Sequence, residues 1–263
     1  MGLFDNNRTV LVTGASSGIG VELARLFAAN GDRLILAARR EDRLKALADE
    51  LSGRHKVEVS VIPCDLAKPE GAKELAIEAG RKGHVVDVLV NNAGFGLRGK
   101  FAKLPFDRQL EMIQVNVTAP TALAGLFLPG MLARGRGGIL NLASLAAFQA
   151  GPDMAIYYAT KAFLLSFSEA LYEETRGTGV SVTALCPGPV PTEFSDVADL
   201  GGTRLFKTGV VTADVVAKAG FDGFQAGKAI VIPGALPKVA SFMTRLGPRG
   251  LNRRVAGAMQ GVE

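Results

Sequence analysis

The stretch Thr9-Val10-Leu11-Val12-Thr13-Gly14-Ala15-Ser16-Ser17-Gly18-Ile19-Gly20 decides the fold. Its β-branched, apolar beginning predicts a buried strand, and the glycines follow at once. The mostly apolar run from Val21 to Ala28 predicts a helix that Asn30-Gly31 can end. A strand, a glycine turn and a helix in this order let the backbone approach a pyrophosphate and leave N–H groups free to bind it. The spacing is Gly-x-x-x-Gly-x-Gly, not the usual Gly-x-Gly-x-x-Gly, and a tight turn without a ligand is the alternative.

Strand-like and helical runs alternate along the rest of the chain. Further strands are predicted at 33–38, 57–63, 85–90, 138–143, 181–186 and 229–232. Helices are predicted at 41–51, 69–82, around Asn116, and at 155–176. This alternation predicts an α/β fold, a doubly wound parallel sheet of about seven strands with helices on both faces, in three αβα layers. Ligands of such folds bind beyond the carboxyl ends of the strands.

Tyr157 and Lys161 stand four residues apart on a predicted helix, and Ser144 follows a predicted strand. Positions i and i+4 share a helix face, so the phenol and the ammonium can act together. The cation is expected to lower the pKa of the phenol, which suits it to proton transfer near neutral pH. A nearby serine hydroxyl can hold a substrate carbonyl oxygen. The three residues therefore suit the reversible reduction of a ketone, although Tyr-x-x-x-Lys alone is a common pattern.

In combination, these motifs resemble the short-chain dehydrogenase/reductase family. The matching segments occur in family order between Thr13 and about Thr192: Thr13-Gly14-Ala15-Ser16-Ser17-Gly18-Ile19-Gly20, Asn91-Asn92-Ala93-Gly94, Asn116, Ser144, Tyr157-x-x-x-Lys161 and Pro187-Gly188. The resemblance implies a Rossmann-like fold and an enzyme that transfers hydride between a nicotinamide cofactor and a carbonyl/alcohol pair. The final seventy residues carry no such signal.

The resemblance assigns catalytic roles to four residues: Asn116, Ser144, Tyr157 and Lys161. In the family, the asparagine helps to hold a water near the lysine, which extends a proton path to solvent. An asparagine inside an apolar helical run is unfavourable by propensity, as expected of a functional position. A buried, hydrogen-bonded structural amide is the alternative.

The resemblance also assigns cofactor contacts. They comprise Gly14, Ser16, Ser17, Gly18, Ile19, Gly20, Arg39, Asp65, Leu66, Asn92, Ala93, Gly94, Tyr157, Lys161, Pro187, Gly188, Val190 and Thr192. Asp65 resembles the aspartate that contacts adenine, with the N-cap of the next helix as an alternative. Asn92 is expected to tie backbone at the end of its strand more than to take part in the chemistry.

The residues after the second strand indicate the choice of cofactor, because NAD-binding folds carry an acid there that binds the ribose 2′-hydroxyl. This chain has Ala37-Ala38-Arg39-Arg40 there, with no acid before Glu41. A guanidinium suits a 2′-phosphate, and in the resembling family an arginine here marks a preference for NADP. Solvated charges at a helix start are the alternative.

Composition limits the other functions. Two cysteines are too few for a disulfide framework, and His55 and His84 are isolated from each other, so no metal site is expected. The first residues lack the basic start and apolar run of a signal peptide, and no uninterrupted apolar run approaches membrane-spanning length. A cytoplasmic protein with no nucleic-acid partner is predicted.

The net charge of +5 lies entirely in the last 41 residues, where Lys228, Lys238, Arg245, Arg249, Arg253 and Arg254 face the single acid Glu263. Within that segment, Val239, Phe242, Met243 and Leu246 form an apolar helical stripe, and Leu251 and Val255 can resume it after Gly247-Pro248. A helix that covers the active site or a subunit interface is the favoured interpretation. Weak docking to an anionic membrane or an acidic acyl-carrier protein is the alternative.

These observations predict one domain over residues 1–263, with residues 193–210 as a substrate lid and 235–263 as a basic C-terminal segment. The predicted function is NADP(H)-dependent interconversion of a ketone or aldehyde and an alcohol, with the tyrosine as general acid and base. A non-catalytic NADP-binding sensor or scaffold, and a sugar-nucleotide epimerase or dehydratase, are the alternatives. A homodimer or homotetramer is expected. The lid composition suits an apolar or mixed substrate without naming one.

Overall fold

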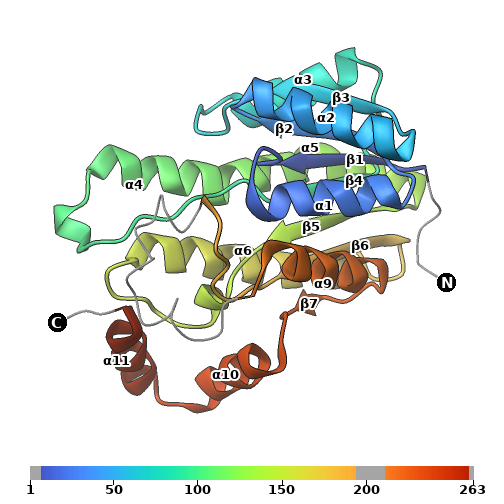
Figure 1. Ribbon diagram of the computed structural model, residues 1–263. Coiled ribbons are helices and arrows are strands. Elements are labelled where there is room, and N and C mark those ends of the chain that lie inside the picture. Colours follow the sequence, from blue (N-terminus) through green and yellow to red (C-terminus); the bar gives the residue numbers. More distant parts are fainter. Residues whose placement is uncertain (1–6, 194–210, 261–263) are drawn as a thin grey trace.

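The computed structural model describes residues 7–193 and 211–260 (Figure 1). Its seven parallel strands form one sheet: β1 (Thr9–Thr13), β2 (Arg33–Ala38), β3 (Val59–Pro63), β4 (Val88–Asn91), β5 (Gly137–Leu142), β6 (Val180–Leu185) and β7 (Ile230–Val231). The strand order is β3-β2-β1-β4-β5-β6-β7. The chain adds β2 and β3 on one side of β1 and β4 to β7 on its other side, so the order of the strands reverses between β1 and β4. Such a switch point opens a crevice beyond the carboxyl ends of the strands, where ligands bind. The predicted doubly wound, three-layer α/β fold is confirmed.

Helices cover both faces of the sheet (Figure 1). One face packs against α1 (Gly18–Ala29), α2 (Glu41–His55) and α9 (Ala213–Gln225), and the other against α3 (Gly71–Arg81), α5 (Ala119–Arg134) and α6 (Ala155–Glu174). Successive side chains of β1 alternate between the two cores: Val10 and Val12 belong to the first, and Leu11 to the second. The strands therefore read as continuous apolar runs because they are buried on both faces.

A long helical run leads through Asn116. It consists of α4 (Phe106–Ile113), a π-helical turn (Gln114–Thr118) and α5. By length and mean hydropathy the run Phe106–Arg134 could cross a membrane. However, Ala119, Leu123 and Met131 are fully buried in the core cluster that also contains Leu89 of β4 and Ile139 of β5. Its apolar character is that of a helix packed on the sheet.

The predicted elements lie close to the observed ones, and β2 occupies the predicted residues. The largest shifts are the start of β4 at Val88 and the extension of α2 to His55, where Lys56 takes a left-handed conformation and ends the helix. The short 3-10 turns η1 (Phe101–Lys103) and η3 (Leu145–Phe148) and the π-helical turn were not predicted.

Two C-terminal helices lie outside the two helical layers that cover the sheet (Figure 1). They are α10 (Ala235–Leu246) and α11 (Arg249–Gln260). The predicted break at Gly247-Pro248 separates them. Of the predicted lid, 193–210, only Glu193 falls within the described residues.

Candidate active site

A cavity of about 790 Å³ opens at the carboxyl end of the sheet. Its walls come from the turn after β1, from the ends of β2 to β6, and from α6, α10 and α11. All predicted site residues line it except Gly20 and Asn116, which lie behind the cavity wall. The volume falls in the range of pockets that enclose small molecules.

The glycine turn is shaped by its contact with Asn92. Gly14 and Gly18 have φ angles of +64° and +56°, which favour glycine. A Cβ on Gly20 would lie 2.4 Å from Asn92 Nδ2 and 2.5 Å from the carbonyl oxygen of Gly14. Asn92 Nδ2 donates to the carbonyl oxygens of Thr13, at 2.9 Å, and Gly14, at 3.1 Å. The predicted role of Asn92 in holding the backbone agrees with these contacts, and Gly20 serves the packing of the turn.

The start of α1 suits a phosphate group. Its N-cap residue Ser17 is extended and makes no capping hydrogen bond, and the first turn contains no acidic residue. The N–H groups of that turn are thus not satisfied by a side-chain cap, and Gly18 and Ile19 line the cavity. These residues fit a dinucleotide pyrophosphate.

The part of the cavity that is predicted to hold the adenosine, the adenosine half, is bordered by Asp65, Leu66 and Arg39. Asp65 Oδ1 accepts a hydrogen bond from the N–H of Ala67 at 3.1 Å, and α3 begins only at Gly71. The alternative in which Asp65 caps the next helix is therefore wrong, because the carboxylate closes a turn before it. Arg39 is exposed and forms no hydrogen bond or ion pair with any residue in 7–193 or 211–260.

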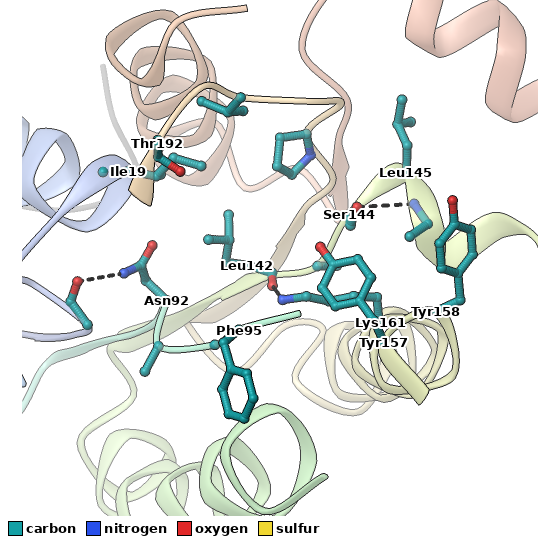
Figure 2. A pocket seen from close by; sticks show the side chains of 18 of the residues that line it. Ile19, Asn92, Phe95, Leu142, Ser144, Leu145, Tyr157, Tyr158, Lys161 and Thr192 are labelled. Atoms are coloured by element: carbon teal, nitrogen blue, oxygen red, sulfur yellow. Dashed lines mark hydrogen bonds between the residues drawn. The ribbon is translucent and has the colours of Figure 1, made fainter. Parts of the chain in front are cut away.

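Ser144, Tyr157 and Lys161 converge at the other end of the cavity (Figure 2). Ser144 follows β5, and its Oγ accepts a hydrogen bond from the N–H of Ala146 at 3.1 Å, which caps η3. Its side chain lies near the Tyr157 hydroxyl and favours the ionised form of that phenol. Lys161 Nζ lies 5.8 Å from the centre of the Tyr157 ring. The carboxyl end of β5 and one face of α6 thus bring the predicted residues together.

The pKa of the phenol differs from the expectation. Burial raises the pKa of Tyr157 above its ordinary value, and the nearby Ser144 side chain offsets only part of this effect. The prediction that Lys161 lowers it is wrong for this arrangement, since Lys161 Nζ donates instead to the carbonyl oxygen of Leu142, at 2.7 Å. Burial also lowers the pKa of Lys161 to about 8.

Asn116 lies in the π-helical turn, and its amide is bound to protein groups on both sides. Nδ2 donates to the carbonyl oxygen of Phe95 at 3.0 Å and to Thr160 Oγ1 at 3.1 Å, and Oδ1 accepts from the N–H of Phe95 at 3.1 Å. A Cβ on Gly94 would lie 3.1 Å from Asn116 Oδ1 and 3.6 Å from Lys161 Nζ, so both groups border Gly94. These contacts favour the structural interpretation of Asn116. Its part in a proton path stays a prediction.

Another part of the cavity, the apolar half, is lined by apolar residues that sequence reasoning did not assign to the site. They are Phe95, Phe148, Met154, Met243, Leu251 and Val255. Three of them come from α10 and α11, which agrees with the favoured interpretation that the C-terminal segment covers the site. The apolar stripe was the only signal for this contact, and a stripe does not say which surface it meets.

Cys186, beside Pro187-Gly188, packs with Ala143, Leu165 and Ala184, and burial raises its pKa to about 12. A neutral, buried thiol is inert as a nucleophile. Tyr158 lies on the cavity wall with its ring centre 6.1 Å from that of Tyr157, in an edge-on arrangement. Both side chains therefore serve the packing of the site.

A doubly wound sheet, a phosphate-binding turn at its switch point, and a serine, a tyrosine and a lysine across the same cavity define an oxidoreductase that uses a pyridine nucleotide. The family model described as short chain dehydrogenase matches residues 8–199. The chain belongs to this family, whose members act on CH–OH groups.

Several relatives extend the comparison. An uncharacterized oxidoreductase of Myxococcus xanthus is 39% identical over 188 residues, which are 72% of this chain and 74% of the relative. A short-chain dehydrogenase from Sphingobium yanoikuyae, solved with NADPH, is 33% identical, with a TM-score of 0.82 over 93% of this chain and 94% of that one. A bulky-bulky ketone specific alcohol dehydrogenase from Comamonas testosteroni is 31% identical, with a TM-score of 0.78 over 92% and 94% of the two chains. A Burkholderia phymatum relative solved with NAD is 26% identical, with a TM-score of 0.83 over 94% and 96%.

Proposed function

We propose that the protein is an NADP(H)-dependent reductase of apolar ketones that also runs in the alcohol-oxidising direction. The observation that carries this proposal is the convergence of the Ser144 and Tyr157 hydroxyls on one wall of the cavity, with Lys161 Nζ 5.8 Å from the centre of the Tyr157 ring. Two hydroxyl groups on the same cavity wall can bind one carbonyl oxygen together. The bound nicotinamide supplies the hydride.

The protein's part is to hold the carbonyl and to supply a proton. Burial raises the pKa of Tyr157, so the phenol is protonated at neutral pH, which is the form that donates. Ser144 holds the carbonyl oxygen while the Tyr157 hydroxyl transfers its proton to that oxygen. Lys161, whose pKa is about 8, carries a positive charge at neutral pH and holds it 5.8 Å from the centre of the Tyr157 ring.

Arg39 supports NADP as the preferred cofactor. Its guanidinium lines the adenosine half of the cavity, and the start of α2 offers no acid at that position for a ribose 2′-hydroxyl. One related structure contains NADPH and another NAD, so membership of the family does not by itself fix the cofactor.

The substrate class follows from the cavity wall. Phe148, Met154 and Leu251 offer apolar surface in the cavity that Tyr157 also lines, and an apolar ketone loses little hydration there. The alcohol dehydrogenase from Comamonas testosteroni, described as specific for bulky-bulky ketones, supports a bulky substrate. Cytoplasmic location, assembly into two or four copies, and weak docking of the basic segment remain predictions.

A panel of apolar ketones with NADPH tests the proposal. The wild-type protein should oxidise NADPH with at least one bulky ketone, and Tyr157→Phe should lower kcat by at least ~10²-fold, the usual scale for a general acid. NADPH binding, measured by fluorescence, should be nearly unchanged in the variant. Turnover of no carbonyl compound, with NADPH still bound, would favour the sensor or scaffold alternative.

A further inference from the structure

Glu193, the residue after the cavity-lining Thr192, joins the two sides of the cavity. Its Oε2 accepts a hydrogen bond from Arg40 Nη1 at 2.7 Å, and its Oε1 accepts one from Arg43 Nη1. Both arginines belong to the start of α2. These two hydrogen bonds hold the pKa of Glu193 below its ordinary value, so the side chain is ionised at neutral pH.

Arg40 is held from a second direction. Its Nε and Nη2 donate to Ser16 Oγ at 3.2 and 3.1 Å, and Nη2 also lies 3.3 Å from the carbonyl oxygen of Ser16. Ser16 follows β1, Arg40 follows β2, and Glu193 follows β6, which is separated from β1 by β4 and β5. The Ser16–Arg40–Glu193 bridge therefore spans the carboxyl edge of the sheet, and its three residues line the same cavity as Arg39.

The bridge affects how a 2′-phosphate, which is a phosphate monoester, can bind beside Arg40. A 2′-phosphate held by Arg39 would stand next to Arg40, whose guanidinium is also a favourable partner for it. Glu193 already engages Arg40 and Arg43 with a carboxylate, and two anions beside one guanidinium repel each other. An adenosine without the 2′-phosphate brings no such charge to this place.

We propose that Glu193 is an internal competitor for the 2′-phosphate of NADP, which must displace it from Arg40 and Arg43, whereas NAD leaves the bridge in place. The proposal rests on the proposed use of NADP. Glu193 is then a specificity-determining residue. It makes the preference for NADP over NAD weaker than it would be with the arginines alone.

Isothermal titration of the full chain with NADP⁺ and NAD⁺ tests this at low and high salt. Glu193→Gln keeps the size of the side chain and removes its charge. It should tighten NADP⁺ roughly three- to tenfold, the scale of one partly exposed ion pair, and change NAD⁺ less than about twofold. The gain should shrink at high salt, because exposed charges are screened.

Glu41→Gln is the matched control. Glu41 lies in the first turn of the same helix, pairs with Lys45 at 2.7 Å and does not line the cavity. Removing its charge should leave the ratio of the two dissociation constants unchanged. An unchanged ratio in Glu193→Gln, equal shifts in the two variants, or weaker NADP⁺ binding in Glu193→Gln would overturn the competitor role. The wild-type ratio tests the NADP preference separately, since the variant must shift the ratio whatever its starting value.

Discussion

Lys161 Nζ donates a hydrogen bond to the carbonyl oxygen of Leu142 at 2.7 Å, which ties α6 to the last residue of β5. The Lys161 side chain is 5% exposed, and burial brings its pKa down to about 8. The ammonium is thus fixed in place beside Tyr157. Burying this charge costs free energy of solvation, and the cost is present only while Lys161 is protonated.

This cost predicts a pH-dependent stability. Folded Lys161 titrates near pH 8 and the unfolded side chain near 10.5, so the unfolded state binds more protons between these values and stability rises with pH there. Lys161→Met lacks this contribution. The free energy of unfolding of the variant relative to wild type should therefore fall by about 1–3 kcal/mol between pH 8 and 10. Urea titrations at several pH values measure it, and parallel pH profiles for the two proteins would contradict it.

Leu142 also shows where prediction from the sequence ends. Tyr157 and Lys161 were predictable because side-chain chemistry and helix periodicity pair them, and the family resemblance added Ser144. A backbone carbonyl that accepts from Lys161 has no residue signature, since any amino acid at position 142 offers the same oxygen. Without this acceptor and the degree of burial, the sequence suggested the opposite shift for the pKa of Tyr157.

Contacts between residues far apart in the chain could not be predicted from the sequence for a different reason. Glu193 and Arg40 are 153 residues apart, and neither belongs to a pattern that selects the other. The strands, by contrast, were predictable because each carries its own apolar run, and the strand order then brings their ends to one edge. The C-terminal stripe predicted a helix over the active site or over a subunit interface, but an apolar stripe alone does not distinguish these two surfaces.

Replacing Asn116 should lower the stability of the protein, because its amide is bound to protein groups. Asn116→Ala removes three hydrogen bonds and leaves the backbone of Phe95 with unpaired groups, so the free energy of unfolding should fall by about 2–4 kcal/mol. Gln114→Ala, in the same π-helical turn, is the control and should cost less than about 1 kcal/mol. Denaturant unfolding measures both. Unchanged stability with a lowered kcat would instead assign Asn116 to the proton path alone.

Arg39 should govern affinity for the 2′-phosphate. Arg39→Gln removes one or two charge-assisted hydrogen bonds to that group, which corresponds to roughly a ten- to hundredfold weaker NADP⁺ complex. NAD⁺ binding should stay within about twofold, because the cofactor lacks the phosphate. Arg33→Gln, an exposed arginine at the first residue of β2, is the control. Equal losses for NADP⁺ and NAD⁺ would show that Arg39 supports the cavity rather than the phosphate.

The C-terminal helices should affect substrate binding and leave cofactor binding unchanged. Leu251 of α11 lines the apolar half of the cavity although 57% of its surface is exposed. Leu251→Ser should raise KM for a bulky ketone by roughly five- to twentyfold, the loss expected for part of one buried leucine, with little change in kcat or in the dissociation constant of NADPH. Val215→Ser makes a similar change at an exposed position on α9 away from the cavity and should leave KM unaltered. If KM is unchanged in Leu251→Ser, or if kcat falls equally in both variants, α11 does not contribute to the substrate site and its apolar face serves another contact.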